Sequence, residues 1–407
     1  MKNLQFFITR IFLKRWIMVL GMIILLFIVN YLSFTAARAL VSTFQGYEEL
    51  ETMNQEGTFI FNLDPNSDAD FNKIELEDTQ KVYEYLNNNY TYALQVGGFI
   101  TPLHNRYNMD VSFNYFNEES YKINQFRLSK GKHLNFDYEF NKEEIPVLVG
   151  AGLSTTYPIG SNIEVTDPVT QQLVNLKVQG ILEKNISRSN YYFPNLNNYF
   201  NFSVFLPVNE EFIQSTGLDF QVNGLMDIAL LDSTKENATN LSAFIQKNLG
   251  LKFNFFSQQE NFNDFEDYYA NLIKVICIII CILLVAIVCL AIWNTLISIR
   301  FMIKDRTINL LDGLSYSKLR GILYSYFGIL FSVNLVILFG IIAFKRYSFW
   351  LNKDAILATY GIFGLISVDW IAFLIVLLIN LIIGFVIVEI TIKKIRKSPI
   401  PSGDQSE

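Results

Sequence analysis

The chain has 407 residues, of which 51% are hydrophobic and 17% are charged, and its mean hydropathy is positive at +0.27. This composition predicts a membrane protein and argues against an ordinary soluble globule. With a formal net charge of −6, the chain is not expected to have a nucleic-acid partner.

The charges divide the chain into two kinds of segment. Between Arg38 and Asp267 there are 31 acidic and 15 basic side chains, a net −16, whereas the remainder carries 17 basic and 7 acidic side chains, a net +10. This asymmetry predicts two environments within one chain. The acidic segment lacks cysteine and, at roughly 230 residues, is long enough to fold around its own hydrophobic core.

The first fifteen residues predict a short amphipathic helix on the inner membrane face. Leu4, Phe7, Ile8 and Ile11 recur at helical spacing among basic and polar residues. A frayed basic terminus is the alternative. The apolar run that follows lacks a cleavage signature, so we expect an uncleaved membrane span.

Four apolar runs predict four membrane spans, because each is long enough to cross a hydrocarbon core of about 30 Å as a helix. We place these spans at residues 16–36, 272–299, 319–344 and 369–392. All nine prolines lie outside the runs, which argues against the broken helices of secondary transporters.

Basic residues predict the orientation of the spans. They gather before the first span, between the second and third, and in the tail at 393–407. The positive-inside rule therefore places both termini in the cytoplasm, with segment 37–271 and the loop 345–368 outside.

The outer segment predicts an α+β domain on helical stalks. Leu76–Asn87 and Lys235–Leu249 are typical of helices, whereas Ile145–Gly150, Ile163–Thr166 and the alternating run at 174–178 are typical of strands. Turns are expected at Ile159-Gly160 and Asp167-Pro168.

Helical stripes continue beyond spans one and two, which predicts two stalk helices that pack together. The residues expected in this stalk or dimer packing are Phe44, Phe265, Tyr269 and Leu272. Two ordinary surface helices of the domain are the alternative.

The aromatic stretch Tyr191–Phe205 has two interpretations. Exposed aromatic side chains can bind a peptide, glycan or lipid, whereas a phenylalanine-rich core would bury them.

Catalytic and metal-binding signals are missing from the sequence. His104 and His133 lie in no recognisable motif, and no CxxC spacing is present. No GxxxxGK[ST] segment occurs, so we expect that the chain is not an ATPase, has no catalytic or cofactor-binding residues, and binds no metal. Cys277 and Cys281 are one helical turn apart in an apolar run, as expected for packing residues.

The segment 300–318, between spans two and three, predicts a short amphipathic helix against the inner face. Ile308, Leu311 and Leu314 form an apolar stripe edged by charge, Gly313 allows a tight exit, and Ser315 or Ser317 could cap the next helix. A cytoplasmic partner could push on two membrane helices here. A basic loop that only sets the topology is the alternative.

These features together resemble the permeases of MacB/FtsX-type ABC transporters, whose layout is one span, a large outer domain and three further spans. The loop element Leu311-Asp-Gly-Leu-Ser-Tyr-Ser317 resembles the family's Leu-x-Ala-Leu-Gly-x-Ser, and Tyr157-Pro-Ile-Gly160 with its flanking strands resembles the family's outer core domain. The sequence departs from the family pattern at Thr307-Ile-Asn309, where Glu-Ile-Gly is usual, and at Gly313-Leu-Ser315, where Ala-Leu-Gly is usual.

The resemblance implies a permease subunit in a bacterial cell membrane that works with a separate ABC ATPase subunit, which would bind the ATP, and with a second permease copy or paralogue. The residues that would couple to the ATPase are Arg300, Lys304, Arg306, Leu311, Gly313, Leu314 and Ser317. Motion of the outer domain would export or extract a peptide, an antimicrobial compound or a lipid-linked molecule. The alternatives are a signalling device that regulates an extracellular enzyme, such as a cell-wall hydrolase, without transport, and a membrane-anchored adhesin or sensor.

Overall fold

The computed structural model describes residues 16–67, 70–101, 103–140, 144–305 and 315–397, with only the main chain described at 270 and 298–305. Two compact units divide the chain. The helical unit comprises Met1–Val41, Ala270–Phe344 and Ser367–Glu407, and the α+β domain comprises Ser42–Tyr269 and Lys345–Ile366. The amphipathic helix expected at residues 1–15 lies outside the described residues.

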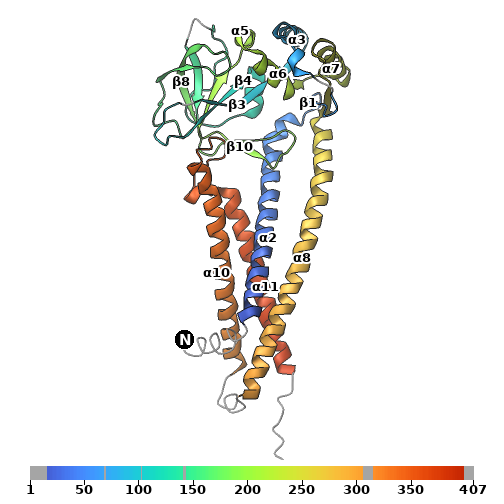
Figure 1. Cartoon of the computed structure of the whole chain (residues 1–407), viewed down its shortest axis with the longest axis vertical. Coiled ribbons are helices and arrows are strands. Elements are labelled where there is room, and N and C mark those ends of the chain that lie inside the picture. The colour runs from blue at the N-terminus through green and yellow to red at the C-terminus, as the bar shows by residue number, and fades with distance from the viewer. Residues whose placement is uncertain (1–15, 68–69, 102, 141–143, 306–314, 398–407) are drawn as a thin grey trace, which may run out of the picture. The chain divides into compact units, whose positions relative to one another are not determined.

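Four long helices carry the apolar runs: α2 (Trp16–Leu50), α8 (Gln258–Asp305), α10 (Tyr316–Leu351) and α11 (Ser367–Lys397) (Figure 1). All four are long and apolar enough to cross a membrane, which confirms the four-span prediction. Because no proline falls within them, their backbone hydrogen bonds run on without interruption. Helices α2 and α8 both extend beyond their apolar runs, as their helical stripes predicted.

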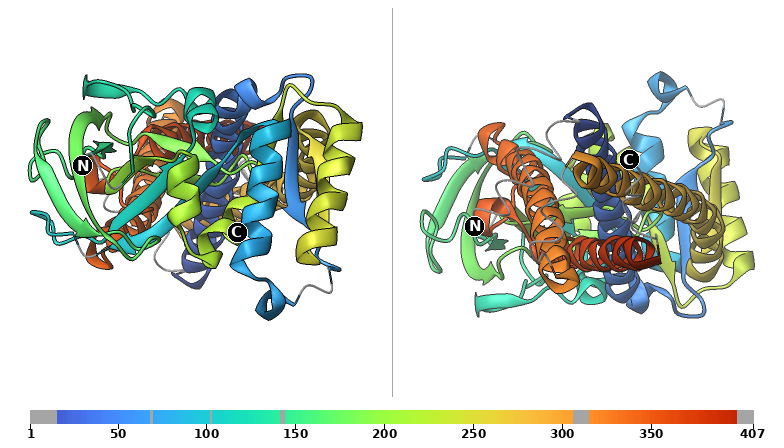
Figure 2. Two further views of the ribbon diagram at one scale, coloured as in Figure 1. Left: turned by 90° about the horizontal axis from the view of Figure 1, so that it is seen from above. Right: turned by 90° about the horizontal axis from the view of Figure 1, so that it is seen from below.

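The core of the helical unit draws side chains from all four helices. In the view from below in Figure 2 these helices form one bundle. The innermost residues are apolar, so they interdigitate without side-chain polar atoms that need hydrogen-bond partners. They include Leu26 and Val29 of α2, Ile287 and Ala291 of α8, Leu323 and Phe327 of α10, and Ile387 and Val388 of α11.

The α+β domain contains two sheets and a small ribbon. The first sheet is antiparallel in the order β13 (Phe253–Ser257), β1 (Phe59–Leu63), β12 (Ala229–Leu231), β2 (Thr91–Ala93). The second has the order β3 (Gln95–Thr101), β4 (Val111–Phe116), β11 (Ser203–Pro207), β6 (Ile145–Val149), β8 (Leu173–Leu182), β5 (Leu128–Gly131), with β7 (Asn162–Thr166) also on β8. Strand β4 is parallel to β11 and β6 to β8, whereas the other pairs are antiparallel. The ribbon pairs β9 (Ser187–Ser189) with β10 (Asn197–Tyr199).

Short helices accompany these sheets, and α3 and α7 lie side by side in the left view of Figure 2. Helix α7 begins after Thr234, whose side chain accepts a hydrogen bond from the Asn237 amide, and it ends at Gly250 with φ +68°. The expected helices and strands of the domain are all present, which confirms an α+β fold. The helices are α3 (Leu76–Asn89), α4 (Glu118–Asn124), α5 (Glu210–Ser215), α6 (Leu218–Met226) and α7 (Lys235–Leu249), with 3-10 turns η3 (Glu51–Met53), η4 (Phe71–Lys73) and η5 (Ile362–Gly364).

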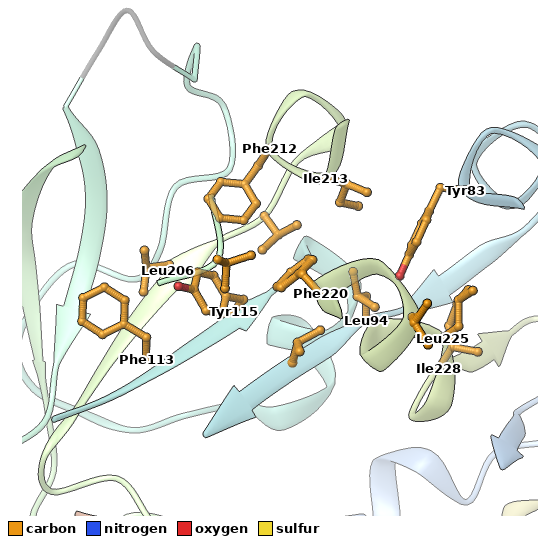
Figure 3. Close-up of a cluster of buried hydrophobic side chains, with 14 of the residues drawn as sticks. Tyr83, Leu94, Phe113, Tyr115, Leu206, Phe212, Ile213, Phe220, Leu225 and Ile228 are labelled. Carbon is orange, nitrogen blue, oxygen red and sulfur yellow. The ribbon is translucent and has the colours of Figure 1, made fainter. Parts of the chain in front are cut away.

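The core of the α+β domain is strongly aromatic, as Figure 3 shows. Tyr115 of β4 lies against Phe212 and Phe220, which come from α5 and α6, with ring centroids 5.5 and 5.3 Å apart. The Tyr115 hydroxyl donates to Asp167 Oδ2 at 2.7 Å, and both residues are fully buried. The predicted turn at Asp167-Pro168 therefore also supplies a hydrogen-bond acceptor to the core.

Two boundaries differ from the sequence prediction. Residues 316–318, expected in the loop before span three, begin helix α10, with Ser315 accepting a hydrogen bond from the Lys318 amide. Helix α10 also continues past Phe344 to Leu351, and the segment after it belongs to the α+β domain.

Candidate functional site

The connection between α10 and α11 is built into the α+β domain by backbone and amide hydrogen bonds. The Tyr199 amide donates to the Ile356 carbonyl at 2.9 Å, and Asn201 Nδ2 donates to the Ala358 carbonyl at 3.0 Å. Asn185 pairs with the Tyr360 main chain in both directions, at 2.7 Å each. Because Asn201 is fully buried, these bonds are shielded from water. We call residues 345–366 the anchored connection.

Trp350 adds an aromatic clasp to the anchored connection. Its ring centroid is 5.4 Å from Phe202, 5.5 Å from Tyr107 and 5.4 Å from Tyr360, each in an edge-to-face arrangement. Its indole Nε1 donates to the Thr359 carbonyl at 2.9 Å. In edge-to-face packing the positive edge of one ring meets the negative face of another. These contacts of Trp350 therefore favour a specific geometry as well as burying apolar surface.

A buried ion pair joins α2 to α11 within the helical unit. Arg38 Nε lies 2.8 Å from Asp369 Oδ1, and the Asp369 side chain is fully buried while that of Arg38 is 34% exposed. Although Asp369 lies near the end of a predicted span, its carboxylate is paired with the Arg38 guanidinium and not exposed to water.

A second polar contact joins α2 to α10. Asn30 Nδ2 donates to Asn334 Oδ1 at 2.8 Å, and Asn334 Nδ2 donates to the Ile23 carbonyl at 3.1 Å. Such bonds between apolar helices contribute about 0.6–2 kcal/mol each. The sequence predicts interhelical hydrogen bonds for Asn294, Asn334 and Asn380, but among the described residues the Asn294 Oδ1 atom and the side chain of Asn380 have no partner.

A third polar contact joins α10 to the other end of α11. Arg320 Nη2 lies 3.0 Å from Glu389 Oε2, and the Tyr324 hydroxyl donates to Glu389 Oε1 at 2.9 Å. The three contacts together tie α2, α10 and α11 to one another at different depths.

Helix α8 is held differently. Only 17% of the most apolar stretch of α8 is buried, whereas 39% of the corresponding stretch is buried in each of the other three helices. Between α8 and α2 lies a groove of about 360 Å³, lined by apolar residues such as Ile28, Leu25 and Leu290 and by Asn294. The three cysteines, Cys277, Cys281 and Cys289, are all exposed on α8. Among the helices described, α8 therefore presents the largest free apolar surface.

The residues predicted to couple to an ATPase lie around the end of α8 and the start of α10. Arg300 and Lys304 belong to the last turns of α8, where only the main chain is described. Ser317 is exposed in the first turn of α10. The others lie outside the described residues, namely Arg306, Leu311, Gly313 and Leu314.

The residues predicted for stalk or dimer packing separate into two pairs. Phe265 is buried and stacks on Tyr269 with ring centroids 4.9 Å apart, and Tyr47 of α2 lies 6.3 Å from Phe265. By contrast, Phe44 and Leu272 are 67% and 46% exposed. The first pair contributes to packing within the chain, and a dimer role for the second pair stays a prediction.

The sequence analysis missed the roles of Asn30, Arg38 and the anchored connection. A single asparagine in the apolar run of span one was a visible signal for an interhelical bond, as was an arginine just after it for an ion pair. The partners of these side chains lie more than 300 positions away, so spacing alone could not identify them.

Comparison with known proteins gives distant structural likenesses. No protein-family model matches the chain, and no curated protein matches it. One similar structure is the extracellular domain of the noncanonic ABC-type transporter YknZ from Gram-positive bacteria, at 11% identity and a TM-score of 0.32, covering 49% of this chain and 100% of that domain. Another is a domain of a protein described as a permease from Porphyromonas gingivalis, at 10% identity and a TM-score of 0.30, covering 51% and 91%. At such low TM-scores neither likeness establishes a shared fold or function.

Proposed function

We propose that this chain is the permease subunit of an ABC transporter in a bacterial cell membrane, and that it transmits the motion of a separate ATPase to its α+β domain outside the cell. The observation that carries the proposal is the anchored connection. The membrane helices reach the domain through α2, through α8 and through residues 345–366, whose hydrogen bonds to Asn185, Tyr199 and Asn201 make them part of that domain. Because α2, α8 and α10 each continue along the chain from the helical unit into that domain, we expect their shifts to be transmitted to it.

Transmission needs one part of the helical unit to move against the rest, and the polar contacts divide the four helices in this way. Helices α2, α10 and α11 share three polar ties, whereas α8 is packed through apolar side chains over part of its length. ATP binding by the partner would move the ends of α8 and α10 around residues 300–318. Because apolar contacts slide more easily than buried ion pairs break, α8 would move against the other three helices. The cargo would be a peptide, an antimicrobial compound or a lipid-linked molecule at the outer face, moved without passing through the spans.

A second permease, identical or paralogous, would pack on α8 over the groove next to α2. The carbonyl oxygen of the Asn294 side chain is buried there without a donor among the described residues, and lipid tails have no donor to offer. A neighbouring helix can supply one.

The native cysteines test this packing without any substitution. If identical subunits pair through α8, copper-phenanthroline oxidation of membranes should give a crosslinked dimer through Cys277, Cys281 or Cys289. The variant with all three replaced by serine should stay monomeric on a non-reducing gel. A heterodimer would instead give a crosslink to a different permease, identified by mass spectrometry, whereas the absence of any permease crosslink would contradict this interface.

Charge reversal in the predicted coupling segment tests the function itself. The chain is purified in mild detergent from its native membrane, and an ATP-binding subunit should accompany it. Lys304→Glu with Arg306→Glu should lower the recovery of that subunit or its stimulated ATPase activity by about tenfold, because two attractive charges become repulsive. Lys247→Glu, at an exposed position of α7 outside the anchored connection, is the matched control. Wild-type chain that brings no ATP-binding subunit would refute the proposal.

A further inference from the structure

The α+β domain contains a second feature that transmission does not use, a cavity of about 210 Å³ beside the β9–β10 ribbon. Its lining comes from β3, β4, the ribbon with the turn that connects its strands, and Phe200, Ser203, Asp227 and Ile356. Gly98 has φ +87°, and a Cβ there would meet no atom within 4 Å, so the β3 bulge forms an open part of the wall. The cavity can hold a group of several non-hydrogen atoms, well beyond a single water.

Arg188 is the charged residue in the lining that has the least contact with water. It is 8% exposed, and neither its Nη1 nor its Nη2 has a hydrogen-bond partner among the residues that the structure describes. The ring of Tyr191 lies against the guanidinium, 4.1 Å from ring centroid to Cζ. Burial lowers the pKa of Arg188 to about 9, since the charged form loses hydration that nothing fully replaces. A buried guanidinium with two free donor nitrogens requires an acceptor.

The neighbouring carboxylates do not meet this requirement. Glu49 accepts from the Ser189 amide at 2.8 Å, from Ser189 Oγ at 2.8 Å and from Ser187 Oγ at 3.1 Å, so neutral donors occupy its oxygens. Asp227 lines the same cavity but forms no ion pair with Arg188 within 4.0 Å in the described chain. Asp227 is exposed, and the nearby charge of Arg188 opposes the rise that desolvation causes in the pKa of its carboxyl group.

Other residues that line the cavity carry acceptor atoms. The Gln95 Oε1 atom is buried with no donor among the described residues, and the carboxylate of Asp227 adds further acceptor oxygens. A ligand that fits therefore presents an anionic group to Arg188 and N–H donors to Gln95 and Asp227. The side chains of Tyr191, Tyr192 and Phe200 add aromatic walls.

The anion that fits has a single charge. Asp227 and Glu49 lie close enough to influence Arg188 electrostatically, so they would repel a dianion such as phosphate. A carboxylate also matches the planar fork of an arginine, and an adjacent ammonium or amide N–H would match the acceptors. We infer that this cavity binds the α-carboxylate end of a free amino acid or a short peptide, held by Arg188, with its N–H groups toward Gln95 and Asp227.

Ligand binding to the wild-type full-length chain in detergent tests this directly, whether or not an ATPase partner is found. The probes are alanine, alanyl-alanine, alanyl-alanine amide and inorganic phosphate. The binding of each probe is measured by calorimetric titration. We expect alanyl-alanine to bind at least about tenfold more tightly than its amide, because the amide lacks the charge that pairs with Arg188. If alanine binds more tightly than alanyl-alanine, the site is assigned to free amino acids. If alanyl-alanine binds more tightly, the site is assigned to the C-terminal ends of peptides.

Substitutions then locate the site. Arg188→Gln should weaken the preferred probe by about 10- to 100-fold, with Arg188→Lys intermediate, since a lysine loses the fork geometry but keeps the charge. Arg127→Gln, at an exposed position of the same domain, should bind as the wild type does. Equal affinity for acid and amide in the wild-type chain, preference for phosphate, or failure of both alanine and alanyl-alanine to bind would overturn the inference without reliance on any variant.

Discussion

Replacing Arg38 by glutamine is expected to destabilise the helical unit by about 3 kcal/mol, because the fully buried carboxylate of Asp369 then loses the charge-assisted hydrogen bond from Arg38 Nε. This is the low end of the range for a broken buried pair, since the arginine side chain is 34% exposed and water can reach it. The measurement is the thermal unfolding of the detergent-solubilised chain, with the midpoint compared at fixed detergent and salt.

The partner substitution and a matched control make this result specific. Asp369→Asn removes the buried charge as well as the pair, so the double variant with Arg38→Gln should be more stable than Arg38→Gln alone. Lys274→Gln changes an exposed basic residue near another span end and should shift stability by no more than about 0.5 kcal/mol. Equal midpoints for Arg38→Gln and Lys274→Gln would show that the ion pair does not hold α2 to α11.

Replacing Trp350 by alanine is expected to release the anchored connection at a local cost of about 2–3 kcal/mol. The loss is smaller than for a fully buried tryptophan because the side chain is half-buried, but it removes three edge-to-face contacts and one hydrogen bond. Hydrogen exchange at the Tyr199 and Tyr360 amides, which bond to or within this region, should quicken by about 30- to 100-fold.

Two comparisons decide whether the release is local. Amides of α3 should keep their exchange rates, because that helix makes its own contacts with α6 and α7. Tyr347→Ala removes a 49% exposed aromatic side chain from the same segment and should leave the Tyr199 and Tyr360 amides unchanged. Fast exchange at both amides already in the wild type would contradict the anchoring.

The sequence predicts those parts of the fold that depend on local pattern. Span length and hydropathy come from consecutive residues, so all four long helices were expected. Helix α7 was expected at its observed bounds because its termini carry local signals, Thr234 before it and Gly250 after it.

The contacts that join distant segments were not predictable in the same way. The bond between Asn185 and Tyr360 joins residues 175 positions apart, and nothing in the hydropathy of residues 345–366 distinguishes an anchored segment from a free loop. The burial of Asp369 likewise depends on Arg38, 331 positions away. Pairing of this kind is set by topology, which a single sequence does not display.

The aromatic stretch Tyr191–Phe205 shows both outcomes side by side. Phe202 and Phe205 are buried in the core, as the interpretation of a phenylalanine-rich core predicts. Tyr191 and Phe200 are also buried, but together with Tyr192 they line the cavity of Arg188, where we propose binding. Composition could not separate these residues, because the sheet register that directs each side chain depends on strands β4 and β6 elsewhere in the chain.

The central proposal is that ATP binding by a partner subunit moves the α+β domain through the membrane helices. Hydrogen exchange of the purified permease–ATPase complex, with and without a non-hydrolysed ATP analogue, tests it most directly. The account predicts that the analogue changes exchange in the anchored connection and around Asn185 and Asn201, and that Lys304→Glu with Arg306→Glu abolishes this change. Identical exchange throughout the α+β domain, in a complex whose ATPase has bound the analogue, would contradict it.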